Sequence, residues 1–280
     1  MNHQPDVLYH YTTQPGLLGI LQSDSLWATK IHYLNDSSEY RLTFEIALDF
    51  LKRILKGEKS KKKCEKINCL ISNLKTIEHL NVCVCSFSAQ RDLLSQWRAY
   101  TGGNTGFSIG FYTDNLVKKA NLQDFALVQC IYNKEEQRNL VEELVLNSLK
   151  QDFNTTPSRI DPSRPRTIIA LPTGGDFALN ITRLAPVIKS HAFHEEAEWR
   201  LVSIKGINVK NMAFRPGKSM ITPYIPIKLG SDKSAYLESI TVGPAPSAEL
   251  SQLSVNSLTA HWGVAQNVKV SCSEASYRNW

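Results

Sequence analysis

The sequence predicts an α+β fold, and three observations lead to this prediction. Apolar residues recur at helical spacing between Glu39 and Leu55, which indicates an amphipathic helix. Short β-prone runs dominate the last third of the chain. The chain has 280 residues, 42% of them apolar, so it can bury a sizeable core in one elaborated domain, although two compact domains would also fit this length.

Each predicted strand is a short β-branched or aromatic run bounded by turn residues. Gln14-Pro15-Gly16 breaks the first run, and Gly102-Gly103 turns the chain into the fourth. In order, the runs are Val7–Thr12, Ser25–Thr29, Asn81–Ser88, Phe107–Phe111, Trp199–Ile204, Met220–Leu229, Leu237–Val242 and Val268–Cys272.

Helices are predicted from apolar spacing together with start and stop residues. Asn35–Ser38 has the composition of a loop that ends in a helix N-cap, and Gly57 ends the long helix that follows. Helices are expected at residues 17–21 and 39–55, after the basic connector Lys59–Lys63, at Leu93–Tyr100, up to about Lys189, and at Ala248–His261.

The domain prediction is one domain over residues 1–280. It includes a helical insertion at about 38–80 and an exposed loop at about 153–170. The segment from Asn154 to Arg166 is rich in Pro, Ser and Arg, which makes it the best candidate for a domain boundary if there is one.

The charge and the motifs exclude several classes of protein. Lys plus Arg exceeds Asp plus Glu by six, and the pI is near 8.9, which favours an anionic partner. The chain has no dinucleotide-binding or Walker glycine loop, no His-Glu-x-x-His and no Gly-x-Ser-x-Gly. It also has no secretion signal and no membrane-length apolar run, so a cytoplasmic protein without a membrane partner is expected.

The six cysteines are too few for a disulfide scaffold. Cys83 and Cys85 point to one side of a predicted strand, where reduced thiols in the core are a better interpretation than zinc ligands. No bound metal is predicted. His191 and His194 with Glu195 leave a metal-dependent hydrolase or nuclease as a remote alternative.

Three separated segments are more informative together than alone: Tyr9–Thr12, Ser86–Ser88 and Glu196–Arg200. With them, the chain resembles a bacterial family known as domain of unknown function 2971. The resemblance runs nearly from end to end, through Leu8–Thr12, Leu26–Ala28, Leu34–Glu39, Ser86–Ser88, Ser95–Tyr100, Gly106–Phe111, Glu198–Arg200, Val242–Pro244 and Tyr277–Arg278.

A second, fainter resemblance is to ADP-ribosyltransferases, in which a strand-borne His-Tyr-Thr, a hydroxyl-rich middle strand and a late glutamate follow in this order. Here the order is His10, then Ser86 and Ser88, then Glu198. The resemblance implies a split pair of small sheets with added helices, which binds NAD without a glycine-rich phosphate loop.

The resemblance implies roles for the two glutamates. Breaking the bond between nicotinamide and ribose builds positive charge on the sugar, which a fixed carboxylate at Glu198 would stabilise in the transition state. Residues two apart on a strand share a face, so Glu196 could orient or deprotonate the acceptor in the same cleft. The alternative is that both glutamates form the solvent face of an amphipathic strand.

The remaining candidate residues would bind NAD. His10 and Thr12 of the His-Tyr-Thr segment are both cofactor-binding candidates, and His10 would donate a hydrogen bond to the adenosine ribose. Ser86 and Ser88 would bond NAD or hold Glu198 in place. Tyr33 and Tyr100 compete for stacking on nicotinamide. Alternatively, His10 is a structural residue, and Trp97 and Tyr100 belong to an ordinary helix rather than stacking on a base.

The sequence therefore leads to a hypothesis and two alternatives. The hypothesis is an NAD-dependent ADP-ribosyltransferase that modifies an RNA or DNA base, as a toxin or anti-phage effector with an antitoxin or regulatory protein as a further partner. The first alternative is a noncatalytic sensor of the same fold that binds a nucleotide or partner. The second is the metal-dependent nuclease.

Overall fold

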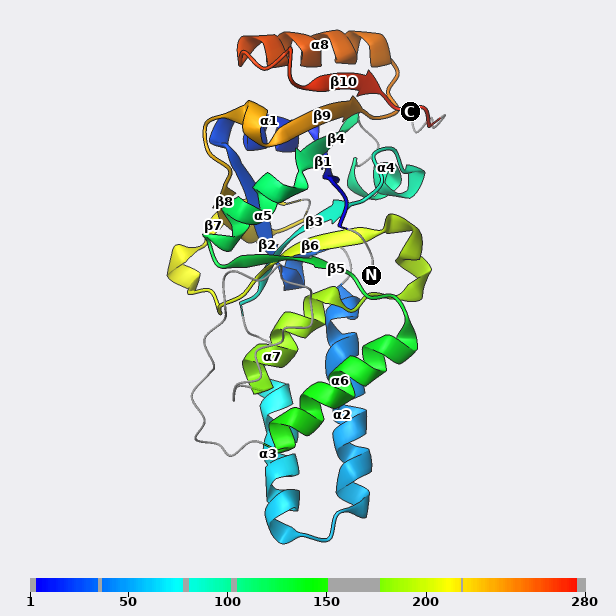
Figure 1. The fold of residues 1–280 in the computed structure, drawn as a ribbon, viewed down its shortest axis with the longest axis vertical. Helices are drawn as coiled ribbons and strands as arrows, with labels where there is room; N and C mark the ends of the chain where they lie inside the picture. The colour runs from blue at the N-terminus through cyan, green and yellow to red at the C-terminus, as the bar shows by residue number, and fades with distance from the viewer. Residues whose placement is uncertain are drawn as a thin grey trace.

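A mostly antiparallel sheet of ten strands runs through the middle of the molecule (Figure 1). The structure is a computed structural model that describes residues 4–34, 37–77, 81–101, 105–150, 177–217 and 219–275. Within these ranges the strands are β1 (Val7–Thr13), β2 (Ser25–Lys30), β3 (Cys83–Ser88), β4 (Gly106–Tyr112), β5 (Phe125–Gln129), β6 (Glu198–Ser203), β7 (Ala213–Pro216), β8 (Ile221–Lys228), β9 (Leu237–Val242) and β10 (Lys269–Cys272).

The order of the main path is β10-β9-β4-β1-β3-β2-β8-β7, and β6 and β5 extend from β3. All pairs are antiparallel except β10 with β9. The α-helices are α1 (Gln14–Ser23), α2 (Ser37–Gly57), α3 (Lys61–Ile77), α4 (Leu94–Tyr100), α5 (Thr113–Asn121), α6 (Lys134–Lys150), α7 (Phe177–Leu184) and α8 (Ala248–His261). Short 3-10 helices are η1 (Ile31–Tyr33), η2 (Ala185–Val187), η3 (His191–Glu196), η4 (Val209–Asn211) and η5 (Lys233–Ala235).

The sheet divides at β3. One edge of β3 pairs with β6 from Val84 to Ser88. Ser88 also pairs with Tyr9 of β1, and Val84 also pairs with Thr29 of β2. Strands β1 and β2 must therefore both lie on the edge of β3 opposite β6. Between them, residues 85–87 have no described strand partner on that edge, since β1 leaves to pair with β4 and β2 leaves to pair with β8.

The central strands are buried on both faces. One face contributes to a sheet core that also receives side chains from α1, α5 and α8; its members include Leu8, Leu26, Cys85, Phe87, Ile109 and Leu201. The other face contributes to a helical core, which includes Tyr40, Leu51, Leu70, Val84, Val141, Ile181 and Val202. This double burial explains why β3 and β6 lack a simple alternation of apolar and polar residues.

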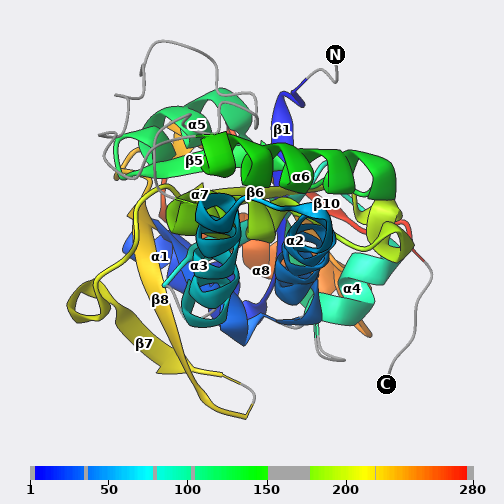
Figure 2. The same ribbon diagram turned by 90° about the horizontal axis from the view of Figure 1, so that it is seen from below.

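The helices that form the helical core gather at one end of the molecule. Figure 1 shows α2 and α3 extending downward beside α6 and α7, and Figure 2 shows this bundle from below. At the other end, α8 covers β9 and β10. The hairpin of β7 and β8 projects from the side of the sheet (Figure 2).

The structure confirms the predicted α+β class. Helices α2 and α3 lie within the predicted insertion at residues 38–80, whereas the predicted loop at 153–170 lies outside the described residues. The predicted connector Lys59–Lys63 is partly wrong, because α3 already begins at Lys61. In the described ranges, no helix combines the length and apolar character needed to cross a membrane.

Candidate functional site

The two predicted catalytic glutamates flank a tight turn at the start of β6. Glu198 begins the strand, whereas Glu196 ends η3, so the prediction that both lie on one strand is wrong. Between them Ala197 adopts the left-handed conformation, with φ 41° and ψ 50°, which reverses the chain within one residue. Both carboxylates nevertheless reach the same cation, because this turn brings their side chains back together.

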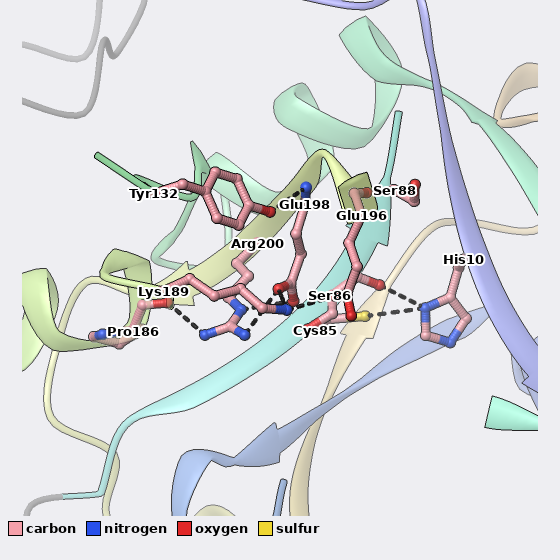
Figure 3. A network of polar contacts seen from close by, with 10 residues as sticks. All are labelled: His10, Cys85, Ser86, Ser88, Tyr132, Pro186, Lys189, Glu196, Glu198 and Arg200. Carbon is pink, nitrogen blue, oxygen red and sulfur yellow. Dashed lines mark hydrogen bonds and ion pairs between the residues drawn. The ribbon is translucent and has the colours of Figure 1, made fainter. Parts of the chain in front are cut away.

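That cation is Lys189, which lies between η2 and η3. Its Nζ donates to Glu196 Oε2 and to Glu198 Oε2, both at 2.5 Å. Arg200, two residues beyond Glu198 on the same strand face, donates from Nε to Oε1 at 2.7 Å and from Nη2 to Oε2 at 2.9 Å. We call Lys189, Glu196, Glu198 and Arg200 the carboxylate network. Figure 3 shows their side chains pointing toward one another.

The carboxylate network is almost closed to solvent. Glu198 is 3% exposed, Lys189 and Arg200 are each 5% exposed, and Glu196 is 9% exposed. The glutamates are therefore not the solvent face of an amphipathic strand, and that alternative is wrong. Arg200 also donates from Nη1 to the carbonyl oxygen of Pro186 at 2.7 Å, which ties β6 to η2.

The charges of the network are mutually stabilising. Burial would raise the pKa of Glu198, but the adjacent Arg200 and Lys189 outweigh it and lower this pKa to about 2. Burial would lower the pKa of Lys189, and the Glu198 carboxylate outweighs that effect and raises it. Glu198 is consequently an anion, and Lys189 a cation, at neutral pH.

Hydroxyl groups complete the surroundings of the two glutamates. The Glu198 backbone N–H donates to the Tyr132 hydroxyl at 2.9 Å, and the Ser88 hydroxyl donates to the Glu196 carbonyl oxygen at 2.7 Å. Tyr100 lies close enough for the Glu198 carboxylate to add to the effect of burial, and both raise the pKa of its hydroxyl. Tyr132 also lines an open surface hollow with Asn133, Lys134, Ser190, His191 and Ala192.

His10 lies away from the carboxylate network. Its Nδ1 donates to the carbonyl oxygen of Ser86 at 2.9 Å, inside the interval where β3 has no strand partner (Figure 3). The ring also contacts Cys85 and Phe87, whose side chains point to the sheet core. Ser86 and Ser88 alternate with these residues and share the other face with Glu198 and Arg200.

The ring chemistry of His10 changes its expected role. Burial lowers the pKa of His10, so the ring is neutral at pH 7. Because a neutral ring that donates from Nδ1 has its lone pair on Nε2, this nitrogen is able to accept a hydrogen bond. A ribose hydroxyl that meets Nε2 would donate to His10, whereas the sequence predicts donation by His10.

Not all of the remaining candidates join the carboxylate network. Ser86 faces Arg200 across the ladder, and Ser88 bonds the backbone of Glu196 rather than the carboxylate of Glu198. Thr12 pairs with Phe107 under the start of α1, and Tyr33 is an exposed residue of η1. No described contact links Thr12 or Tyr33 to the two glutamates.

Tyr11 and Trp97 pack together as structural residues. Tyr11 is buried, packs edge-on against Trp97 at 4.7 Å and donates to the Gln90 carbonyl oxygen at 2.8 Å. Trp97 is 1% exposed and donates to Asp92 Oδ1 at 2.6 Å, so the alternative that its ring stacks on a base is wrong.

Neither of the proposed metal clusters is assembled. His191 and His194 stack on each other at 4.9 Å, but the described residues contain no group of three or more His, Cys, Asp or Glu side chains that could hold a metal ion. Cys83 and Cys85 are free, buried thiols of the sheet core, as expected. The metal site considered at His191, His194 and Glu195 is therefore not assembled in the described part of the chain.

Sequence reasoning missed Lys189, Tyr132 and the function of Arg200. The period of the strand puts Arg200 on the face of Glu198, which could have revealed that pair. Lys189 and Tyr132 come from separate elements, and their approach to Glu198 depends on the parallel bridge between Ile131 and Ile188. Nothing in the local sequence signals that bridge.

Part of the chain is similar to a known protein family. Residues 96–201 match the family of proteins of unknown function DUF2971. The DUF2971 match contains Tyr132 and all four residues of the carboxylate network, and it confirms the predicted resemblance to this family over that segment. No curated protein and no solved structure matches the chain, and nothing in these comparisons supports a resemblance to ADP-ribosyltransferases.

Proposed function

We propose that the chain is an NAD-dependent ADP-ribosyltransferase whose catalytic carboxylate is Glu198. The observation that carries this proposal is the fixed, ionised state of that carboxylate on β6, next to the hydroxyl-bearing strand β3. An oxocarbenium-like ribose needs a preorganised negative charge, and a carboxylate with a pKa of about 2 supplies it at any physiological pH.

The division of the sheet at β3 gives further support. A transferase of this type is expected to hold NAD between two small sheets that split apart, and β1 and β2 part along one edge of β3. β1, β3 and β6 are neighbours in the sheet, so the His-Tyr-Thr and Ser-x-Ser segments and Glu198 lie on adjacent strands, with Glu196 in the turn before β6. Such an arrangement agrees with the proposed order of site residues.

In the proposed reaction the bond between ribose C1′ and the nicotinamide nitrogen breaks, and its electron pair leaves with nicotinamide. The acceptor forms the new bond to C1′ and loses a proton, for which Glu196 is the nearest second carboxylate. Oε2 of Glu198 accepts from both Lys189 and Arg200, whereas Oε1 accepts only from Arg200 among the described contacts, so Oε1 is the oxygen to which a ribose hydroxyl would donate once the buried site opens. Ser190, next to Lys189, lines the open hollow from which a ligand could approach.

The proposed acceptor is a nucleic-acid base, because the chain carries a net charge of +6. The proposed setting is a toxin or anti-phage effector in the cytoplasm, restrained by a partner protein. These parts of the proposal rest on the charge and the resemblance alone.

The test incubates the protein with labelled NAD and with RNA, DNA or cell lysate, and measures label transfer and nicotinamide release. We expect both in the wild type, and a loss of at least about 100-fold in Glu198→Gln. Glu45→Gln is the matched control, because Glu45 is exposed on α2, far along the chain from the network. Thermal melting of both variants shows whether each is folded. Absence of label transfer and nicotinamide release in the wild type would refute the proposal.

A second candidate is a noncatalytic nucleotide-binding module of the same fold. It is favoured by the 3% exposure of Glu198 and by the cations that already occupy both of its oxygens. It predicts that NAD or ADP-ribose raises the melting temperature while no nicotinamide is released, even with saturating acceptor.

A further inference from the structure

Arg215 on β7 is a cation without a counter-ion. None of the ion pairs found in the described part of the chain includes it, and its Nε is buried without a hydrogen-bond partner. Its one described hydrogen bond runs from Nη2 to the Thr29 hydroxyl at 3.1 Å. A half-buried guanidinium is normally paired, because desolvating a charge without compensation is unfavourable.

The guanidinium lies on an aromatic pair. Its Cζ is 5.5 Å from the centroid of the Trp27 ring, and Trp27 contacts Tyr224 with 5.3 Å between ring centroids. Trp27, Tyr224 and Arg215 are all partly exposed, so a ligand can reach them. Stacking on one face leaves the edge of the guanidinium, where its N–H groups point, available for a planar or tetrahedral anion.

The position of Arg215 is next to the opening in the sheet. Thr29 pairs with Val84, the residue that precedes the unpaired interval of β3. Burial is the main cause of the lowered pKa of His10 and of the raised pKa of Cys85, and the positive charge of Arg215 acts on both groups.

These groups together have the chemistry of a nucleotide site. Arg215 offers charged donors for phosphate oxygens, Trp27 and Tyr224 offer aromatic surface, and His10 offers a neutral acceptor at Nε2 for a sugar hydroxyl. We propose that Arg215 binds the phosphate groups of a nucleotide at the opening between β1 and β2. The identity of this nucleotide rests on the proposed function, which makes the bound group the diphosphate of NAD.

The test measures binding of ADP, NAD, inorganic phosphate and adenosine by titration calorimetry, and does not depend on turnover. The wild type is expected to bind ADP and NAD, with affinity that falls as salt rises, and to bind adenosine much more weakly. Arg215→Gln should weaken ADP binding about tenfold or more, and Arg215→Lys should lie between, since it keeps the charge and loses the forked geometry. Lys210→Gln, which removes an exposed charge of equal sign, should stay within about twofold.

Two results would overturn the anion site: no ADP binding by the wild type, or equal ADP binding by Arg215→Gln and Lys210→Gln. Melting curves verify that each variant is folded. If Arg215→Gln does not fold, the comparison is made with Arg215→Lys instead. Arg215-dependent ADP binding without nicotinamide release would support the site and refute the transferase. Nicotinamide release at the wild-type rate and KM in Arg215→Gln would refute the site and leave the transferase standing.

Discussion

Lys189 is the residue on which the buried charges depend. It contacts both Glu196 and Glu198, and removing it would leave Arg200 as the described cation partner of Glu198. A buried ion pair is weak evidence of net stabilisation, but breaking one by removing a single partner leaves an uncompensated charge. The side chain of Lys189 therefore sets the stability of this region irrespective of catalysis.

Replacing Lys189 by methionine, which keeps most of its volume, is expected to lower the free energy of unfolding by about 3 kcal/mol or more. Arg53→Ala is the control, because its 2.6 Å ion pair with Glu142 lies at the surface, where Arg53 is 62% exposed, and its loss should cost less than about 1 kcal/mol. Urea unfolding of both variants measures the difference. Equal losses would show that the carboxylate network is not the stabilising unit inferred from the structure.

At the scale of single elements, most predicted strands and helices agree with the structure. The strand at Leu237–Val242 and the helix at Ala248–His261 have the predicted bounds, since each has a clear period and turn residues at its ends. Residues 113–150 received no prediction, yet they form α5, β5 and α6. The strand predicted at Trp199–Ile204 is β6 within one residue, whereas Glu196, expected on the same strand, lies before the turn at Ala197, which has no glycine to mark it.

The junction of η3 and β6 provides a prediction about that turn. A non-glycine residue in the left-handed region is strained, so Ala197→Gly is expected to raise the free energy of unfolding by roughly 0.5–1 kcal/mol. Ala47→Gly, in the interior of α2, should lower it by about 1 kcal/mol or more. Denaturant titrations measure whether each substitution raises or lowers the free energy of unfolding. A loss of stability in Ala197→Gly would mean that the turn is not strained.

At the scale of the whole molecule, the carboxylate network makes stability depend on pH. The pKa of Glu198 is about 2 in the folded chain and about 4.5 in the unfolded chain. The contribution of ionised Glu198 to the free energy of unfolding is fully present above pH 4.5 and is lost as the pH falls toward 2, because the unfolded state binds the proton first. The shift corresponds to roughly 3 kcal/mol at most.

Unfolding free energies of the wild type and Glu198→Gln, measured between pH 6 and pH 2, test this linkage. The wild type should be more stable at pH 6, and the difference should shrink below pH 4.5 as the carboxylate of Glu198 is protonated. A difference that is constant over this range would show that Glu198 is not held ionised by its neighbours.

The sequence by itself determined the α+β class, most of the elements, and the presence of a hydroxyl-bearing strand followed by a late glutamate, because these depend on periodicity and residue type within short segments. Tertiary structure alone decided that β3 pairs with β6, that Lys189 contacts Glu198, that His10 donates to Ser86 in the opening on β3, and that Arg215 lies beside this opening. Each of these depends on contacts between residues distant along the chain or on the burial that such contacts create, and neither burial nor distance is encoded in local pattern.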